Sequence, residues 1–154
     1  MSGSGASGKP APPLGGVLET AVYVDDLAVA SAFYVRLLGR EPMVRQARLH
    51  AFEVAPAETL LLFPRALSKD DAVTPFGTVP AHYANGPAHF AFRIAAEQYE
   101  PWRQWLAAEG LAVISEVNWP QGGHSLYFND PDGNVLEVAT PGLWPNYKLG
   151  SGEH

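Results

Sequence analysis

The stretch YFNDPDGNVLEVA, residues 127–139, carries a strong turn signal between two apolar runs. Its residues 129–134 are Asn, Asp, Pro, Asp, Gly and Asn, which favour tight turns through their backbone preferences and short polar side chains. The stretch therefore predicts two strands joined by a turn. In the second strand Glu137 interrupts an otherwise apolar run, which needs a reason because burying an unpaired charge is costly.

The chain outside this stretch divides into two similar halves, each with the pattern strand–helix–strand–strand–strand. The expected strands cover 17–24, 43–55 (one or two strands), 59–64, 88–94, 111–119, 124–130 and 134–140, and the expected helices cover 27–39 and 97–110. Such internal repetition indicates a fold built from two copies of one supersecondary unit.

The spacing within the halves supports the repeat. Glu19 is followed by Gly39 after 20 residues, and His89 is followed by Gly110 after 21. In the same way Leu61 lies nine residues after Phe52, and Glu137 lies nine residues after Phe128. Superposing the halves therefore places Glu19 on His89 and Leu61 on Glu137.

Composition limits the classes of function. The formal net charge is −6, which argues against a nucleic-acid partner because such proteins usually present a basic face. The sequence has no cysteine, so it offers no disulfide, thiolate metal ligand or cysteine nucleophile. No apolar run is long enough to span a membrane and no secretory signal precedes the first strand, so we expect a cytoplasmic protein without a membrane partner.

The domain boundaries follow from composition. Residues 1–16 are mostly Gly, Ser, Pro and Ala, and we expect a disordered leader there. The folded domain is expected to cover 17–147, with modules at about 17–64 and 87–142, and 148–154 should be a flexible tail. The segment 65–86 is long and rich in turn residues, so we expect a linker or a lid.

Strand alternation brings three polar residues to one side. Glu19, His89 and Glu137 each have the parity that points away from the helix-packed face, toward the concave side of a sheet. Taken singly, each is more simply a solvent-facing Glu or a structural His. Their repeat-equivalent positions favour a joint role, and two carboxylates with one imidazole suit a divalent metal that keeps positions for water and substrate.

The stretches LETAVYVDDLAVASAFYVRLLG, GPAHFAFRI and SLYFNDPDGNVLEVATPG resemble the vicinal oxygen chelate superfamily, which includes glyoxalases, bleomycin-resistance proteins and extradiol dioxygenases. The resemblance implies an α+β fold in which two βαβββ modules form a curved, incomplete mixed barrel. It also implies a homodimer and a divalent metal ion (Mn, Zn, Ni, Fe or Mg) held by Glu19, His89 and Glu137.

The sequence departs from two patterns within that superfamily. Leu61 occupies the position of the fourth ligand of glyoxalase I, which points to the three-ligand arrangement of fosfomycin-modifying enzymes and extradiol dioxygenases. Those proteins usually have His where this chain has Glu19. Two carboxylates with one His favour a metal that acts as a Lewis acid over iron-dependent oxygen chemistry.

Further residues are candidates for the substrate pocket. The resemblance implies substrate contacts from Ser125 and Tyr127, although Tyr127 could equally pack the barrel. Phe63 and Trp119 are expected to form an apolar wall, and His82 is a candidate acid or base if it is not simply a solvated loop residue. The catalytic candidates are Glu137 and Glu19, because either could act as a base on leaving the metal.

The sequence leaves two functions open. The first is a metal-dependent enzyme that chelates a small oxygen-bearing substrate, with the reaction left open among lyase, isomerase, transferase and dioxygenase chemistry. The alternative is a metal-free protein that binds a small molecule or antibiotic, as bleomycin-resistance proteins do. A domain with a vestigial site is disfavoured because Glu19 and His89 are both polar.

Overall fold

The computed structural model describes residues 10–146, and it has the α+β architecture with two open sheets that the sequence predicts. The first sheet has the order β1 (Glu19–Val24), β4 (Glu58–Pro64), β3 (Leu49–Ala55), β2 (Val44–Gln46). The second has the order β7 (His89–Arg93), β10 (Val135–Ala139), β9 (His124–Asn129), β8 (Ser115–Asn118). The predicted tail 148–154 and most of the predicted leader lie outside the described residues.

The two sheets share one strand order and one register, which confirms the predicted repeat. In the first sheet β1 pairs with β4 in parallel, with Glu19 opposite Thr59 and Ala21 opposite Leu61. In the second sheet β7 pairs with β10 in parallel, with His89 opposite Val135 and Ala91 opposite Glu137. Leu61 therefore occupies in the first module the place that Glu137 occupies in the second.

Helix α1 (Leu27–Leu38) begins where the sequence predicts and ends one residue before the predicted end at Gly39. The Asp26 carboxylate accepts hydrogen bonds from the backbone N–H groups of Ala28 and Val29, which satisfies donors that have no partner within the helix. Gly39 closes the helix with a φ of 69°, a left-handed conformation that glycine adopts at little cost. Helix α3 (Tyr99–Ala108) follows a short 3₁₀ turn, η2 (Ala96–Gln98), in the second module.

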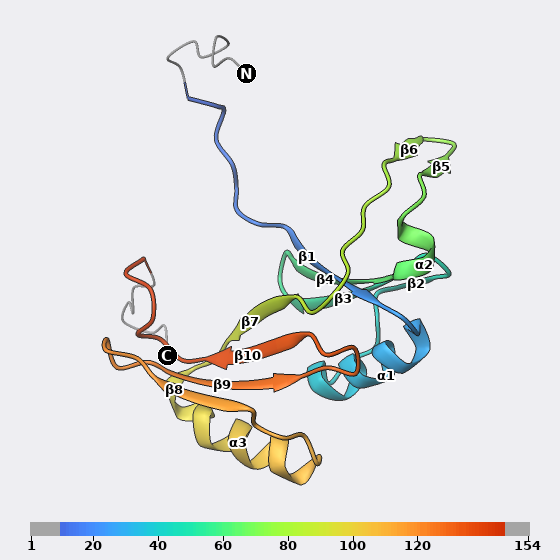
Figure 1. The fold of residues 1–154 in the computed structure, drawn as a ribbon. Coiled ribbons are helices and arrows are strands. Elements are labelled where there is room, and N and C mark those ends of the chain that lie inside the picture. The colour runs from blue at the N-terminus through green and yellow to red at the C-terminus, as the bar shows by residue number, and fades with distance from the viewer. Residues whose placement is uncertain (1–9, 147–154) are drawn as a thin grey trace.

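The hydrophobic core is shared by the two modules. Val22 and Val24 of β1 are buried together with Leu136 and Val138 of β10. Figure 1 shows the first sheet lying over the second, with α3 on the far side of the second sheet. Strand alternation then leaves Glu19 and Ala21 exposed on the other face of β1, as the sequence predicts.

The turn between β9 and β10 is organised by Asp130. One oxygen of its carboxylate accepts hydrogen bonds from the backbone N–H groups of Asp132 and Asn134, each at 2.9 Å. The other oxygen accepts from the side-chain amide of Asn134 at 2.8 Å. The side-chain oxygen of Asn134 in turn accepts a hydrogen bond from the backbone N–H of Ala88, which connects the turn to the residue before β7.

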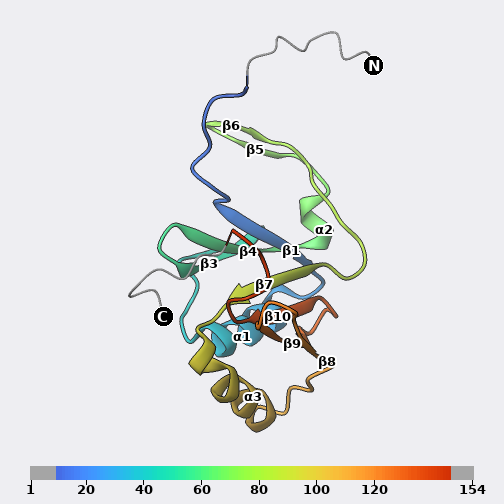
Figure 2. The ribbon, with the colours of Figure 1, turned by 90° about the vertical axis from the view of Figure 1, so that its left-hand side faces the viewer.

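Two segments differ from the expectation. Residues 111–114 are irregular, so the predicted strand at 111–119 is shorter and covers only Ser115–Asn118. The predicted linker 65–86 contains a short helix, α2 (Arg65–Ser68), and a hairpin of β5 (Ala72–Thr74) and β6 (Gly77–Val79). Figures 1 and 2 show this hairpin projecting away from both modules. Within residues 10–146, no helix is long and apolar enough to cross a membrane.

Candidate metal centre

A cavity of about 350 Å³ opens on the second module. The residues that line it come from β7, β9, β10 and the segments after β8 and β10: His89, Ala91, Phe92, Arg93, Trp119, Tyr127, Glu137, Ala139, Thr140, Leu143 and Trp144. Four of the residues predicted for the site are among them. Aromatic and apolar walls around a few polar groups are typical of a small-molecule site.

Glu137 occupies the middle of β10, between β7 and β9, and only 4% of its surface is exposed. Its neighbours across the sheet are Ala91 and Tyr127. The small side chain of Ala91 leaves room on that face, and the carboxylate reaches the cavity rather than the core. This placement accounts for the carboxylate in an apolar strand.

His89 is fixed in one orientation by its own strand partner. Its Nδ1 lies 2.8 Å from the backbone carbonyl of Val135, and a carbonyl oxygen can only accept a hydrogen bond. Nδ1 therefore carries a proton. In the neutral ring the lone pair is then on Nε2, as in most histidines that bind metals through Nε2.

The Nε2 atom of His89 lies 3.3 Å from Oε1 of Glu137. A lone pair and a carboxylate oxygen this close repel each other unless positive charge lies between them. A proton would make the contact an ion pair, and a divalent metal would make the two atoms ligands. Ligand atoms at about 2.1 Å from one metal stand about 3.0 to 3.4 Å apart at angles of about 90° to 110°. The two side chains therefore fit a divalent metal.

The second oxygen of Glu137 belongs to a buried hydrogen-bond chain. Ser125 is fully buried and donates to Oε2 at 2.5 Å, and Trp119 donates its indole N–H to the Ser125 hydroxyl at 2.8 Å. Tyr127 stacks on His89 with ring centroids 6.0 Å apart. Burial, followed by the charge of Glu137 and a hydrogen bond with it, raises the pKa of Tyr127 above its usual value.

Glu19 does not join this cluster within one chain. It lies at the start of β1 on the first sheet, exposed and opposite Thr59. Among residues 10–146, no group of three or more His, Cys, Asp and Glu side chains is arranged to hold a metal ion. One chain therefore brings His89 and Glu137 together, while the predicted third ligand remains on the other module.

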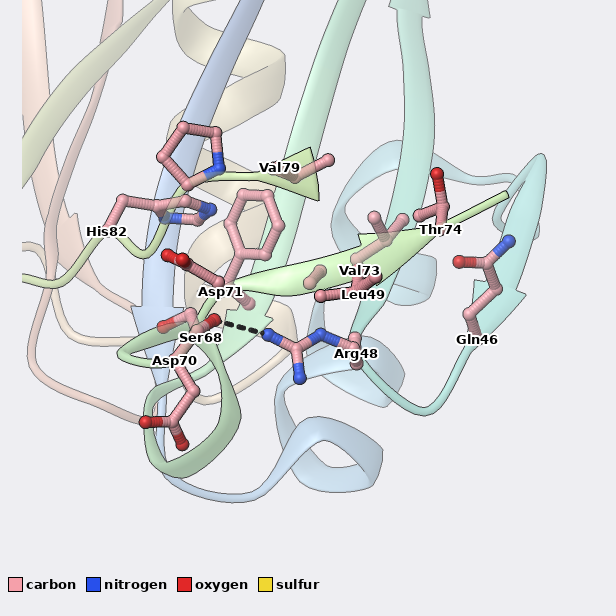
Figure 3. A pocket seen from close by; sticks show the side chains of 13 residues that line it. Gln46, Arg48, Leu49, Ser68, Asp70, Asp71, Val73, Thr74, Val79 and His82 are labelled. Atoms are coloured by element: carbon pink, nitrogen blue, oxygen red, sulfur yellow. Dashed lines mark hydrogen bonds between the residues drawn. The ribbon is translucent and has the colours of Figure 1, made fainter. Parts of the chain in front are cut away.

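Phe63 and His82 also lie apart from Glu137, in a second cavity of about 310 Å³ between the first sheet and the β5–β6 hairpin. Figure 3 shows His82 at one end of this cavity, and Arg48 donating to the backbone carbonyl of Asp70. The Nδ1 of His82 lies 2.6 Å from the hydroxyl of Tyr23, and its ring packs edge-on to Phe63. Of the predicted substrate-binding residues, Tyr127 and Trp119 thus line the first cavity, Phe63 and His82 line the second, and Ser125 lines neither.

Arg93 and Trp144 are among the residues that line the first cavity without having been predicted for the site. Arg93 lies on the same face of β7 as His89 and Ala91, and strand alternation alone could have identified it. Trp144 follows β10 in an irregular segment, where no periodic signal marks its position.

These features define a two-module protein in which His89 and Glu137 of the second sheet lie close enough to serve as two ligands of one metal ion. Residues 16–138 match the model of the Glyoxalase/Bleomycin resistance protein/Dioxygenase superfamily, which is more than half of the chain. The protein belongs to this superfamily, also known as the vicinal oxygen chelate superfamily.

Three relatives illustrate the range of similarity. "Glutathione transferase FosA" of Serratia marcescens is 40% identical over 58 residues, which are 36% of this chain and 38% of that protein. "Metallothiol transferase FosB" of Staphylococcus saprophyticus is 34% identical over 53 residues, 34% of this chain and 35% of that protein. The match thus spans little more than a third of each of these two relatives. The structure of lactoylglutathione lyase from Agrobacterium tumefaciens is similar over 87% of this chain and 99% of its own, with 34% identity and a TM-score of 0.79.

Proposed function

We propose that the protein is a metal-dependent enzyme that binds a small oxygen-bearing substrate in the cavity around His89 and Glu137. The observation that carries this proposal is the 3.3 Å distance between Nε2 of His89 and Oε1 of Glu137. Because Nδ1 of His89 donates to a carbonyl, both atoms can act as ligands of one cation. The relatives' names support it in outline, since one names a metal and two name glutathione or its lactoyl derivative. They include both transferases and a lyase, so the proposal assigns no reaction.

A divalent cation at this site would supply Lewis-acid chemistry and stabilise negative charge that develops on substrate oxygens. The chain's own residues would orient the substrate. Trp119, Tyr127 and Trp144 supply the apolar and aromatic wall. Arg93 also lines the cavity, and its guanidinium lies 3.5 Å from a carboxylate oxygen of Glu58. We keep Glu137 and Glu19 as the candidate acid–base residues, because their carboxylates would lie beside the reacting atoms.

We propose further that the protein is a homodimer in which Glu19 of the partner subunit supplies the third ligand. Glu19 is exposed on a face of β1 that no helix covers, and His89 and Glu137 lie on a similarly open face of the second sheet. Apposing these two faces from two copies would bring the three side chains to one ion. The open faces, which expose Ala21 and Ala91 beside these ligands, support that arrangement.

Metal analysis tests the proposal directly. We expect the purified protein to retain about one equivalent of Mn, Zn, Ni, Fe or Mg per chain after dialysis, measured by inductively coupled plasma mass spectrometry. Glu137→Gln should lose the metal, because the amide has nearly the same shape but a weak donor oxygen. Wild-type protein that takes up no divalent metal, even after reconstitution, would contradict the enzyme proposal.

Mixing two inactive variants tests the shared site. In a Glu19→Gln homodimer and in a Glu137→Gln homodimer, every site lacks one carboxylate. After unfolding and refolding together, a mixed dimer would contain one intact site, made by Glu19 of one chain and Glu137 of the other. Recovery of metal binding only in the mixture supports the shared site, whereas no recovery indicates that each chain builds its site alone.

The alternative is a metal-free protein that binds a small molecule in the same cavity. Its volume of about 350 Å³ and its four large aromatic side chains, Phe92, Trp119, Tyr127 and Trp144, suit a small organic ligand without a metal. The metal analysis separates the two functions. A cavity that binds a small molecule equally well in wild type and in Glu137→Gln, with no metal in either, would favour the alternative.

A further inference from the structure

We propose that Trp119 and Ser125 are positioning residues of the metal centre, forming a hydrogen-bond relay that holds Glu137 with Oε1 directed at His89. This inference rests on the proposed function. It assigns to Ser125 a role different from the substrate contact that the resemblance implied, and it gives Trp119 a second role beside its place in the apolar wall.

The direction of the relay is fixed by the chemistry of its members. An indole N–H can only donate, so the Ser125 hydroxyl must accept the bond from Trp119. A hydroxyl has a single hydrogen, and Ser125 therefore gives it to Oε2 of Glu137. A donor to a carboxylate makes a charge-assisted hydrogen bond, which is stronger than a neutral one. Ser125 thereby holds Oε2, while Oε1 lies 3.3 Å from Nε2 of His89. Tyr127 also interacts with this carboxylate, so Ser125 is one of two neighbours that can orient it.

The burial of Ser125 favours a positioning role over a direct contact with the substrate. Ser125 is 0% exposed and is not among the residues that line the cavity. Trp119 is half-buried, and its ring lines the cavity while its N–H points to Ser125. A ligand in the cavity would therefore meet the indole ring of Trp119 but not the hydroxyl of Ser125.

The backbone holds the relay in place. Ser125 lies on β9 opposite Ala139 of β10, two residues along from the pair formed by Tyr127 and Glu137. Trp119 begins the turn between β8 and β9, and its backbone N–H and carbonyl bond to Gly123 and Gly122 at 2.8 and 2.9 Å. Both donors thus sit on paired strands or a closed turn, and neither depends on a flexible loop.

Metal affinity of the full-length apo protein is the test, with Mn²⁺ as the probe and electron paramagnetic resonance of the free ion as the readout. Ser125→Ala should weaken Mn²⁺ binding by about 10- to 100-fold, the usual effect of losing a partner that orients a ligand. Trp119→Phe should weaken it less. The double variant should match Ser125→Ala alone, because Trp119 acts only through Ser125. Ser125→Thr keeps the hydroxyl and should retain most of the affinity.

Ser31→Ala is the matched control. Ser31 is also buried, at 4% exposure, and its hydroxyl bonds to His50 on the first module. Its loss should lower stability without changing Mn²⁺ affinity. All variants are compared at a protein concentration where they elute as the same oligomer as wild type. Trp119→Phe keeps an aromatic ring in the wall and provides the test if Ser125→Ala does not fold.

The outcomes are distinct. Wild type that binds Mn²⁺, Glu137→Gln that does not, and Ser125→Ala with unchanged affinity would overturn the relay while leaving the proposed function standing. Additive effects of Trp119→Phe and Ser125→Ala would also overturn it, since the two groups would then act separately. Wild type that binds no divalent metal would remove the proposed function and the relay with it.

Discussion

Tyr34, on the helix of the first module, donates a hydrogen bond of 2.7 Å to Asp130, in the turn that leads to Glu137. Both side chains are buried, with 0% and 5% of their surfaces exposed. Burial, reinforced by the charge of Asp130, raises the pKa of the Tyr34 phenol well above its usual range, so the hydroxyl remains a donor at any ordinary pH. This bond joins helix α1 of the first module to the β9–β10 turn of the second.

Tyr34→Phe should therefore destabilise the protein by about 1.5 to 3 kcal/mol, the usual contribution of a hydrogen bond to a charged group. The ring stays in place and only the donor is lost. Urea unfolding followed by circular dichroism measures the change. Tyr83→Phe is the control, because Tyr83 is 50% exposed and its substitution should stay within about 0.5 kcal/mol. Equal effects of the two substitutions would contradict a structural role for the Tyr34–Asp130 bond.

Metal addition should stabilise the protein through linkage. A ligand that binds only the native state at 100 times its dissociation constant adds about 2.7 kcal/mol to the free energy of unfolding. We expect Mn²⁺ at that level to raise the unfolding midpoint of wild type and EDTA to reverse the increase. Glu137→Gln should show neither change. A matching shift in that variant would place the bound metal elsewhere on the chain.

The lowered pKa of His50 should make the protein less stable in mild acid. Partial burial, followed by the positive charge of Arg45, lowers the pKa of His50 below 6.5. The unfolded chain then binds a proton more readily than the native state, and stability is lost as the pH falls from 6.5 through the lowered native value. Urea unfolding at pH 7.5 and 5.5 should show a smaller loss for His50→Gln than for wild type. An identical loss in both proteins would exclude His50 as its source.

Substitution of two phenylalanines should change the free energy of unfolding by very different amounts. Phe52 is 0% exposed on β3, and Phe52→Ala should cost about 3 to 5 kcal/mol because it leaves a cavity in the shared core. Phe76 is 98% exposed at the tip of the β5–β6 hairpin, and Phe76→Ser should change the stability of the isolated chain by less than about 0.5 kcal/mol. A large loss in Phe76→Ser would show that another molecule covers the hairpin tip.

The sequence was sufficient for the parts of the fold that depend on local patterns. Strand alternation placed Val22 and Leu136 in the core, and the repeat put Glu137 and Leu61 in the same register position. The β5–β6 hairpin was missed because its strands have three residues each, too few for alternation to stand out around Pro75.

The site required tertiary information that periodicity does not carry. Alternation predicted that Glu19 and Glu137 face the same way, but it could not show that Glu19 lies apart from the His89–Glu137 pair within one chain. The bond from Trp119 to Ser125 depends on how a turn folds back on β9, and on side-chain rotamers. Such contacts follow from packing between elements, and no single stretch of sequence contains them.

The separation of Glu19 from His89 and Glu137 has a consequence for symmetry. In the proposed shared centre each chain contributes two unlike half-sites, one on each sheet, so two copies related by a two-fold axis would use all four half-sites and leave none unpaired. The two centres of such a dimer would arise and disappear together when chains associate or dilute apart. One defective Glu137→Gln chain in a mixed dimer with wild type would then remove a single centre and leave its neighbour intact.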